Sequence, residues 1–95
     1  MQFMVVMRRR SDRFTDEDFK ALVADEQAQA RALYMEGLLR QIWYRGDMGG
    51  GVLLLEADDL DAAKAAINRL PFVERDMLEI TDFMPLKPFG GFGIR

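Results

Sequence analysis

The residue best placed for chemistry is Glu26, a carboxylate that stands within an apolar helical stripe. It lies four residues after Leu22 and four before Ala30, on a face whose members recur at three- and four-residue steps. Apolar surroundings of this kind raise the pKa of a carboxyl group. A position at the edge of the stripe, or an ion pair with an arginine, is the plainer alternative. The remaining members of the stripe are Phe19, Val23, Leu33 and Gly37.

The residue types that the chain lacks restrict its chemistry. Its 95 residues include no histidine and no cysteine. Without cysteine there is no disulfide framework and no zinc–thiolate site. Without histidine there is no Ser-His-Asp or Cys-His catalysis and no ordinary proton shuttle at neutral pH. Any catalysis must therefore use carboxylates, arginine, lysine, tyrosine, hydroxyl groups or the backbone, and we expect no metal site.

Arg40 and two aromatic residues are the next candidates. The guanidinium group of Arg40 could hold a substrate carboxylate through two hydrogen bonds or stabilise an oxyanion, with a salt bridge to Glu26 or Glu79 as the alternative. Trp43 and Tyr34 could form an apolar wall or donate a hydrogen bond, although both would also suit the core. Arg40 and Trp43 are three residues apart, so in a regular strand they point to opposite faces. They share a pocket only if a bulge intervenes or if one of them reaches in from the strand end.

Four further residues are weaker candidates. Tyr44 and Arg45 could contact a substrate. Glu79 and Glu56 lie on predicted strands, where a structural ion pair is the alternative to a role as the base. The predicted site therefore has Glu26 and Arg40 as catalytic residues, and Tyr34, Trp43, Arg45 and Glu79 as substrate-binding residues.

The elements that must position these residues follow from apolar periodicity and turn signals. The first helix is predicted to have about 20 residues, from a Thr15 cap to Gly37 as its C′ glycine. Asp58 or Asp59 caps a second helix, which Pro71 ends. The resulting βαββαβ order is typical of the ferredoxin-like α+β fold, a four-stranded antiparallel sheet with both helices on one face. The predicted strands span residues 2–8, 38–45, 52–56 and 76–84, and Pro85 and Pro88 stop the last one.

Both faces of the predicted sheet are apolar. In the first strand Phe3, Val5 and Met7 alternate with Met4 and Val6, and the third strand is apolar on both faces too. Two helices cover only one face, so the other would expose a larger apolar patch than monomers usually carry. We therefore expect a homodimer with its sheets face to face, or a larger homo-oligomer built from such dimers.

The chain divides into two predicted parts. Residues 1–86 form the ferredoxin-like domain, and residues 87–95 form a glycine-rich C-terminal tail without periodicity. Phe89, Phe92 and Ile94 suit an arm that packs on a neighbouring subunit, and a disordered end is the alternative.

Composition limits the partners and the location. The chain has 13 basic and 16 acidic residues, a net charge of −3, whereas nucleic-acid binders carry a net basic face. No apolar run approaches the roughly 18 residues of a membrane span. The basic residues near the N-terminus follow the apolar stretch, and in a signal peptide they precede it. We expect a cytoplasmic protein that binds neither nucleic acid nor membrane.

Several short motifs are distributed along the chain: Glu26-x-Ala28, Leu33, Gly37-x-x-Arg40-x-x-Trp43, Leu70-Pro71 and Leu78-Glu79-Ile80-Thr81. With these motifs the sequence resembles the muconolactone delta-isomerase family over roughly residues 2–84. The resemblance implies a dimeric α+β barrel, oligomers built from dimers, and a role in aromatic compound catabolism. It also implies a cofactor-independent 1,3-proton shift on a small unsaturated lactone such as muconolactone, and related enzymes eliminate chloride from chlorinated analogues.

A 1,3-proton shift beside a lactone carbonyl needs a base, a group that stabilises the dienolate oxygen, and an anchor for the substrate carboxylate. Glu26 is the first candidate for the base, and Arg40 for the stabiliser or anchor. Two other functions suit the same fold. One is a cofactor-independent monooxygenase of the antibiotic-biosynthesis type, which needs an apolar cavity with one or two polar groups; a lining of methionine and aromatic side chains only would favour it. The other is a non-catalytic oligomeric small-molecule-binding protein, in which Glu26 and Arg40 pair inside the core.

Overall fold

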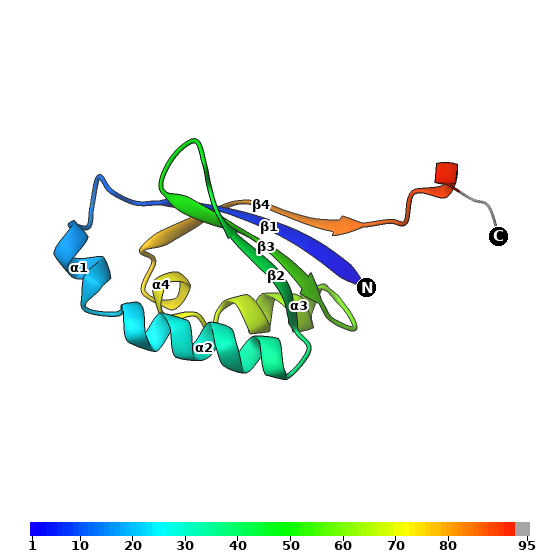
Figure 1. Cartoon of the computed structure of the whole chain (residues 1–95), viewed down its shortest axis with the longest axis horizontal. Coiled ribbons are helices and arrows are strands. Elements are labelled where there is room, and N and C mark those ends of the chain that lie inside the picture. Colours follow the sequence, from blue (N-terminus) through cyan, green and yellow to red (C-terminus); the bar gives the residue numbers. More distant parts are fainter. Residues whose placement is uncertain (93–95) are drawn as a thin grey trace.

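Four strands form an antiparallel sheet in the computed structural model, which describes residues 1–92. The strand order is β2-β3-β1-β4, and the helices lie against one face of the sheet (Figure 1). The predicted ferredoxin-like α+β fold is therefore confirmed. None of the helices within residues 1–92 is long and apolar enough to span a bilayer. The elements are β1 (Gln2–Arg9), α1 (Asp16–Lys20), α2 (Val23–Met35), β2 (Leu39–Tyr44), β3 (Gly50–Glu56), α3 (Leu60–Ile67), α4 (Pro71–Glu74), β4 (Leu78–Leu86) and the 3₁₀ helix η1 (Gly90–Phe92).

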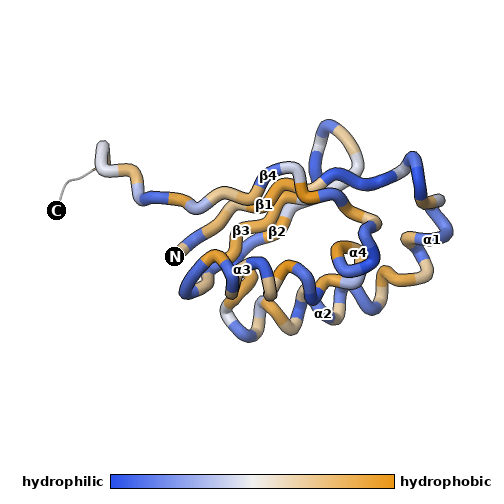
Figure 2. Tube along the Cα trace, turned by 180° about the vertical axis from the view of Figure 1, so that it is seen from behind, coloured by the Kyte–Doolittle hydropathy of each residue, from blue (hydrophilic) through white to orange (hydrophobic). Residues whose placement is uncertain are grey.

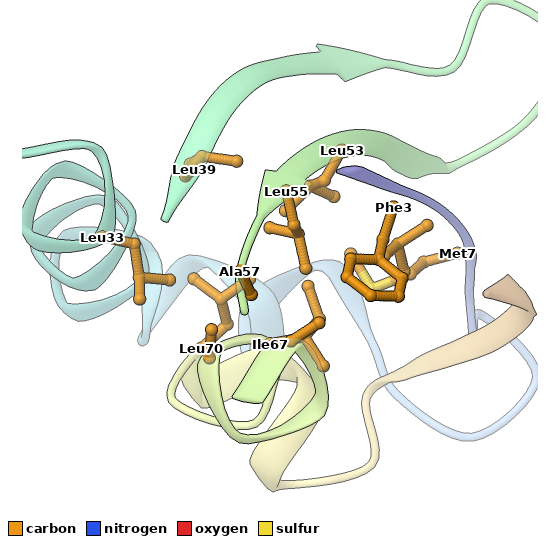
Figure 3. Close-up of a cluster of buried hydrophobic side chains, with 12 residues drawn as sticks. Phe3, Met7, Leu33, Leu39, Leu53, Leu55, Ala57, Ile67 and Leu70 are labelled. Atoms are coloured by element: carbon orange, nitrogen blue, oxygen red, sulfur yellow. The ribbon is translucent and has the colours of Figure 1, made fainter. Parts of the chain in front are cut away.

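The core lies between the sheet and the helices (Figure 3). Phe3, Val5 and Met7 of β1 are buried on the face that the helices cover, and Leu55 and Leu53 of β3 pair with the first two. Each such buried side chain contributes roughly 1.5–3 kcal/mol to folding. The helices and the turn after α3 add Leu33, Ala63, Ala66, Ile67 and Leu70 to the same cluster.

The opposite face of the sheet is apolar as well, as the sequence predicts. Met4 and Val6 of β1 pair with Leu54 and Val52 of β3, and all four are only half-buried. Figure 2 shows both central strands coloured mainly as hydrophobic. In Figure 1 none of the described helices covers this face, which we call the open face.

The first helix is broken, which corrects the prediction of a single long helix. Thr15 caps α1 as predicted, and the carboxylate of Asp18 accepts the reciprocal bond of a capping box. The backbone of Leu22, with φ −114° and ψ 1°, then leaves the helical conformation before α2 begins. The break allows Phe19 to be buried against Phe72 of α4, with 5.2 Å between ring centroids. The free energy gained by burying this ring outweighs the free energy lost by interrupting the helix.

The second part of the predicted helix ends where expected, but not every residue of its predicted apolar stripe is buried. Leu33 is fully buried, whereas Val23 at the start of α2 is 39% exposed. Gly37 is the C′ glycine, as predicted, with φ +82°. The N–H of Leu38 donates to the carbonyl of Leu33, and the N–H of Gly37 donates to the carbonyl of Tyr34, each at 3.0 Å. These two bonds form a Schellman motif.

Two prolines behave differently from the prediction. The helix capped by Asp59 already ends at Ile67, and Pro71 begins α4, where its missing N–H would have no helical partner. Pro85 does not stop the last strand, because β4 continues one residue beyond it and Pro85 pairs with Phe3 of β1. As an edge strand, β4 tolerates proline.

Beyond β4 the chain runs away from both the sheet and the helices (Figure 1). Phe89 and Phe92 contact each other edge to face, with 4.8 Å between ring centroids, and both are exposed. Ile94, the third apolar residue of the predicted arm, lies outside the described residues.

The β2–β3 hairpin depends on a glycine at the start of β3. The strand begins at Gly50, two residues before its predicted start, and Gly50 has φ +141°. A Cβ atom at this position would lie 2.1 Å from the carbonyl oxygen of Met7 in β1. Both the backbone conformation and the close approach of β1 therefore require glycine.

We expect Gly50→Ala to lower the free energy of unfolding by about 2–4 kcal/mol, because the methyl group strains the backbone and collides with β1. Gly46→Ala is the matched control, since nothing lies within 4 Å of a Cβ there. It should change stability by less than about 0.5 kcal/mol. Urea denaturation measures both variants, and equal stabilities would contradict the prediction.

Candidate active site

A cavity of about 800 Å³ lies between the first two helices, the start of α4 and the end of the sheet that carries the β2–β3 hairpin. A hollow of this size suits a small molecule. Its lining combines apolar side chains with one carboxylate and three guanidinium groups. The charged residues are Glu26, Arg9, Arg31 and Arg45. Within the described part of the chain, no cluster of three or more acidic side chains could hold a metal ion.

The cavity begins where the large side chains of the sheet end. On the helix-facing side of β3, Leu55 and Leu53 fill the core, and the next position on that side is Gly51. Because Gly51 has no side chain, space remains between the hairpin and the helices. Phe19 and Phe72, packed edge to face, close the cavity where α1 meets α4.

Glu26 lines the cavity from α2 and is half-buried. Its Oε1 accepts a hydrogen bond of 2.9 Å from the backbone N–H of Phe72, in the first turn of α4, where N–H groups have no helical partner. Within residues 1–92 no basic side chain forms an ion pair with it. Burial raises the pKa of Glu26, and the bond from Phe72 offsets part of that rise. The carboxylate is therefore more basic than that of a free glutamate.

The three arginines of the cavity are held in different ways. Arg45 donates two hydrogen bonds, of 3.0 and 2.8 Å, to the carboxylate of Asp47 in the hairpin loop. Arg9, at the end of β1, pairs with Asp16 in the first turn of α1. Arg31 is exposed on α2 and has no ion pair among the described residues. The cavity thus has more positive than negative charge in its lining.

Arg9 and Arg31 are not among the residues predicted from the sequence. For Arg9 a signal was present, since it continues the two-residue alternation of Val5 and Met7 and must therefore face the helices. Arg31 follows an alanine of the apolar stripe, and its position alone gives no comparable signal.

The structure brings together only part of the predicted site. Glu26 and Arg45 line the cavity from opposite sides, one on α2 and one after β2. Tyr34 and Arg40 instead line a separate hollow of about 340 Å³, where α2 turns into β2. Glu26 and Arg40 are therefore neither paired with each other nor in one cavity.

A bulge of the kind considered for Arg40 and Trp43 is present. The register of β2 against β3 shifts between Leu39 and Gln41, at Arg40. Trp43 touches the cavity, but it pairs with Val52, so its side chain belongs to the open face and is 46% exposed. The bulge at Arg40 therefore does not bring this residue into the cavity that Trp43 touches.

Glu79 and Glu56 both take part in ion pairs, which is the structural alternative stated for them. The carboxylate of Glu79 accepts hydrogen bonds from Arg8 at 2.6 Å and from Arg10 at 3.3 Å. Glu56 binds the N-terminal ammonium group of Met1 at 2.6 Å. The pairs of Glu79 fasten the end of β1, and Arg10 directly after it, to the start of β4. Neither glutamate lines a hollow described above.

The fold and the cavity define a ferredoxin-like α+β protein with a charged hollow of small-molecule size. A family model described as muconolactone delta-isomerase matches residues 1–90. The chain therefore belongs to the muconolactone delta-isomerase family. No curated protein matches the chain.

Two solved structures share the fold. Muconolactone isomerase is 23% identical over 94% of this chain and 91% of that chain, with a TM-score of 0.76. The 5-chloro-2-hydroxyhydroquinone dehydrochlorinase of Burkholderia phenoliruptrix AC1100, in complex with 2,5-dihydroxybenzoquinone, is 16% identical. It covers 96% of this chain and 98% of its own, with a TM-score of 0.68. At these identities the likeness establishes the fold.

We expect Glu26→Gln to stabilise the folded protein at neutral pH. Because burial raises the Glu26 pKa, the folded protein loses stability as the pH rises above the ordinary value of 4.5 and the carboxyl group ionises. Glutamine avoids this loss, and its amide oxygen can still accept the hydrogen bond from Phe72. Chemical denaturation across acidic to neutral pH measures the difference between the variant and the wild type.

Asp25→Asn is the control, because Asp25 is an exposed acidic neighbour on the same helix and does not line the cavity. It should bring no gain at neutral pH. The gain of E26Q should disappear once the pH falls below the ordinary glutamate pKa. A gain that persists unchanged in acid, or a loss of stability at neutral pH, would contradict the assigned cause.

Proposed function

We propose that this protein is a cofactor-independent isomerase that moves a proton between two carbons of a small unsaturated lactone such as muconolactone. The observation that carries the proposal is the half-buried Glu26 carboxylate, which has no cationic partner among the described residues and lines a cavity of small-molecule size. Membership of the muconolactone delta-isomerase family supports it. A cytoplasmic location and a role in aromatic compound catabolism belong to the same proposal.

In the proposed reaction Glu26 acts first as the base and then as the acid. Its carboxylate takes a proton from the γ carbon of the ring, which lies next to the carbon–carbon double bond on the side away from the lactone carbonyl. The electron pair spreads onto the carbonyl oxygen and gives a dienolate. The same carboxyl group returns the proton to the carbon beside the carbonyl, so the double bond moves and no atom is lost. A pKa above the ordinary glutamate value suits both transfers.

Other residues of the cavity stabilise the negative charge of the dienolate. Arg45, which two hydrogen bonds to Asp47 hold in place, supplies positive charge from the hairpin side. Phe19 and Phe72 give the cavity apolar walls, and positive charge acts more strongly on a dienolate there than in water.

The lining favours this reaction over the two alternatives. An oxygenase of the type considered would have a cavity lined only by methionine and aromatic side chains. Here one carboxylate and three guanidinium groups join four aromatic side chains and one methionine in the lining. A non-catalytic binding protein would pair Glu26 with Arg40 inside a filled core, whereas these residues line separate hollows.

We also propose that a second copy of the chain covers the open face and forms a dimeric α+β barrel. Met4, Val6, Val52 and Leu54 form an apolar strip at the centre of this face, and the half-exposed Trp43 extends it on β2. In this assembly residues 1–86 form the domain and residues 87–95 the inter-subunit arm.

We propose that the hollow lined by Tyr34 and Arg40 takes part in the function only in this assembly. Within one chain these residues do not share the cavity of Glu26. Their predicted roles in substrate contact and catalysis therefore depend on a neighbouring copy. Glu79 is already engaged by Arg8 and Arg10, so we propose a supporting role for it in place of substrate contact.

The purified protein is expected to convert muconolactone to its isomer, followed by proton NMR. Glu26→Gln should lower kcat by about 10²–10⁴-fold, because an amide cannot accept the proton. Asp25→Asn should retain activity. The wild-type kcat should fall as the pH drops through the Glu26 pKa, which burial places above 4.5. Absence of turnover would overturn the substrate, and full activity of E26Q would overturn Glu26 as the base.

Analytical ultracentrifugation should give a mass at least twice the 10.9 kDa of one chain. Leu54→Glu should yield monomers, since it places an unpaired carboxylate at the centre of the proposed interface. Ala65→Glu, on an exposed position of α3, is the control and should leave the assembly intact. A wild-type protein that sediments as a monomer would refute the proposed dimer.

A further inference from the structure

We infer that Arg9 binds the negatively charged group of the ligand, and that the cavity thereby selects small cyclic carboxylates over their neutral analogues. The inference rests on the proposed function, because it names the residue that sets the substrate class of the same cavity. Arg9 reaches the cavity from the end of β1, where the helix-facing row of core side chains gives way to a charged one.

The orientation of Arg9 is fixed by its neighbours. Its guanidinium carbon lies 3.9 Å from the centroid of the buried Phe19 ring. Its stem passes close to Gly49, where a Cβ atom would lie 3.1 Å from both Cβ and Cδ of Arg9. Phe19 and Gly49 line the cavity themselves. A guanidinium group stacked in this way is ordered before a ligand arrives, so binding costs less entropy.

The present partner of Arg9 is exchangeable. Asp16 accepts a hydrogen bond of 2.5 Å from Nη2 of Arg9, yet the Asp16 side chain is 92% exposed. An ion pair that is open to water on one side contributes little stability. A ligand carboxylate inside the cavity would meet the same guanidinium group with less competition from water. Ligand binding can therefore replace Asp16 on Arg9 at small cost.

Arg9 also has unused hydrogen-bonding capacity. Its Nε–H is buried and has no acceptor among the described residues, although buried donors are nearly always paired. Within residues 1–92 its side chain donates to Asp16 alone. Nη1 also donates to none of the described residues, so a carboxylate with two oxygens can accept from Nη1 and Nη2 together, whereas Asp16 accepts with a single oxygen.

The other two arginines of the cavity are less suited to this role. Arg45 already donates hydrogen bonds from two of its nitrogens to Asp47, two residues away in the chain. Arg31 is exposed on α2 and stacks on none of the described aromatic rings. Arg9 alone combines a fixed orientation, an unused donor and an exchangeable partner.

The test compares muconolactone with its methyl ester, which differ by one negative charge. Both are titrated calorimetrically into the E26Q protein, in which the base is removed, and the acid should bind more tightly. Arg9→Gln in this background should weaken binding of the acid by about 10–100-fold, the loss of one charge-assisted interaction, and leave binding of the ester unchanged. Arg13→Gln is the control, because Arg13 pairs with Asp76 outside the cavity.

Asp16→Asn provides a second test with the opposite sign. Removal of the competing carboxylate should tighten binding of the acid by about two- to fivefold and leave the ester unaffected. Glu17→Gln is its control, since Glu17 stands beside Asp16 in the same exposed turn. This variant leaves Arg9 and Phe19 intact, so it decides the question even if R9Q folds poorly.

The outcomes separate this inference from the proposed function. Acid-selective binding that weakens in R9Q and strengthens in D16N supports Arg9, even if the wild type does not isomerise muconolactone and the proposed function alone fails. Turnover by the wild type, with acid binding unchanged in both variants, overturns Arg9 and leaves the function standing. Equal binding of acid and ester, or no binding of either, also overturns the role of Arg9.

Discussion

Successive side chains of a strand point to opposite faces, and in β1 this alternation determines both the core and the cavity. Phe3, Val5 and Met7 face the helices and are buried. The same period brings Arg9 to that face, beyond the last large core residue. Opposite Met7, β3 supplies Gly51 in place of leucine, so the row of side chains that begins as core ends as the wall of a hollow. One row thus gives the protein its stability at one end and a charged lining at the other.

The hydrogen bond between Glu26 and the N–H of Phe72 holds a basic carboxylate in the lining of this hollow. It joins α2 to the start of α4 at the wall of the cavity, so the carboxylate is held without an arginine to neutralise it. Desolvation then outweighs the hydrogen bond and raises the Glu26 pKa. A salt bridge at the same place would hold the side chain equally well and would lower its basicity. A backbone donor therefore leaves the carboxylate more basic than a structural ion pair would.

The sequence was sufficient for the fold, because apolar alternation and turn residues are local signals. The βαββαβ order, the cap at Thr15 and the C′ glycine at Gly37 were all predictable. The break at Leu22 was not, since it results from the burial of Phe19 against a ring that lies far along the chain. For the same reason the site was predicted only in part. Helical periodicity marked Glu26, but nothing local showed that Arg40 would line a separate hollow or that Arg9 would line this one.

Pro85 has a consequence for how copies of the chain can meet. It lies in β4, one of the two edges of the sheet, and a proline has no N–H with which to extend a ladder. An incoming strand would lose a backbone bond at this point, so growth of the sheet from edge to edge is disfavoured on this side. The residue that merely seemed to end a strand thus protects the molecule from open-ended polymerisation.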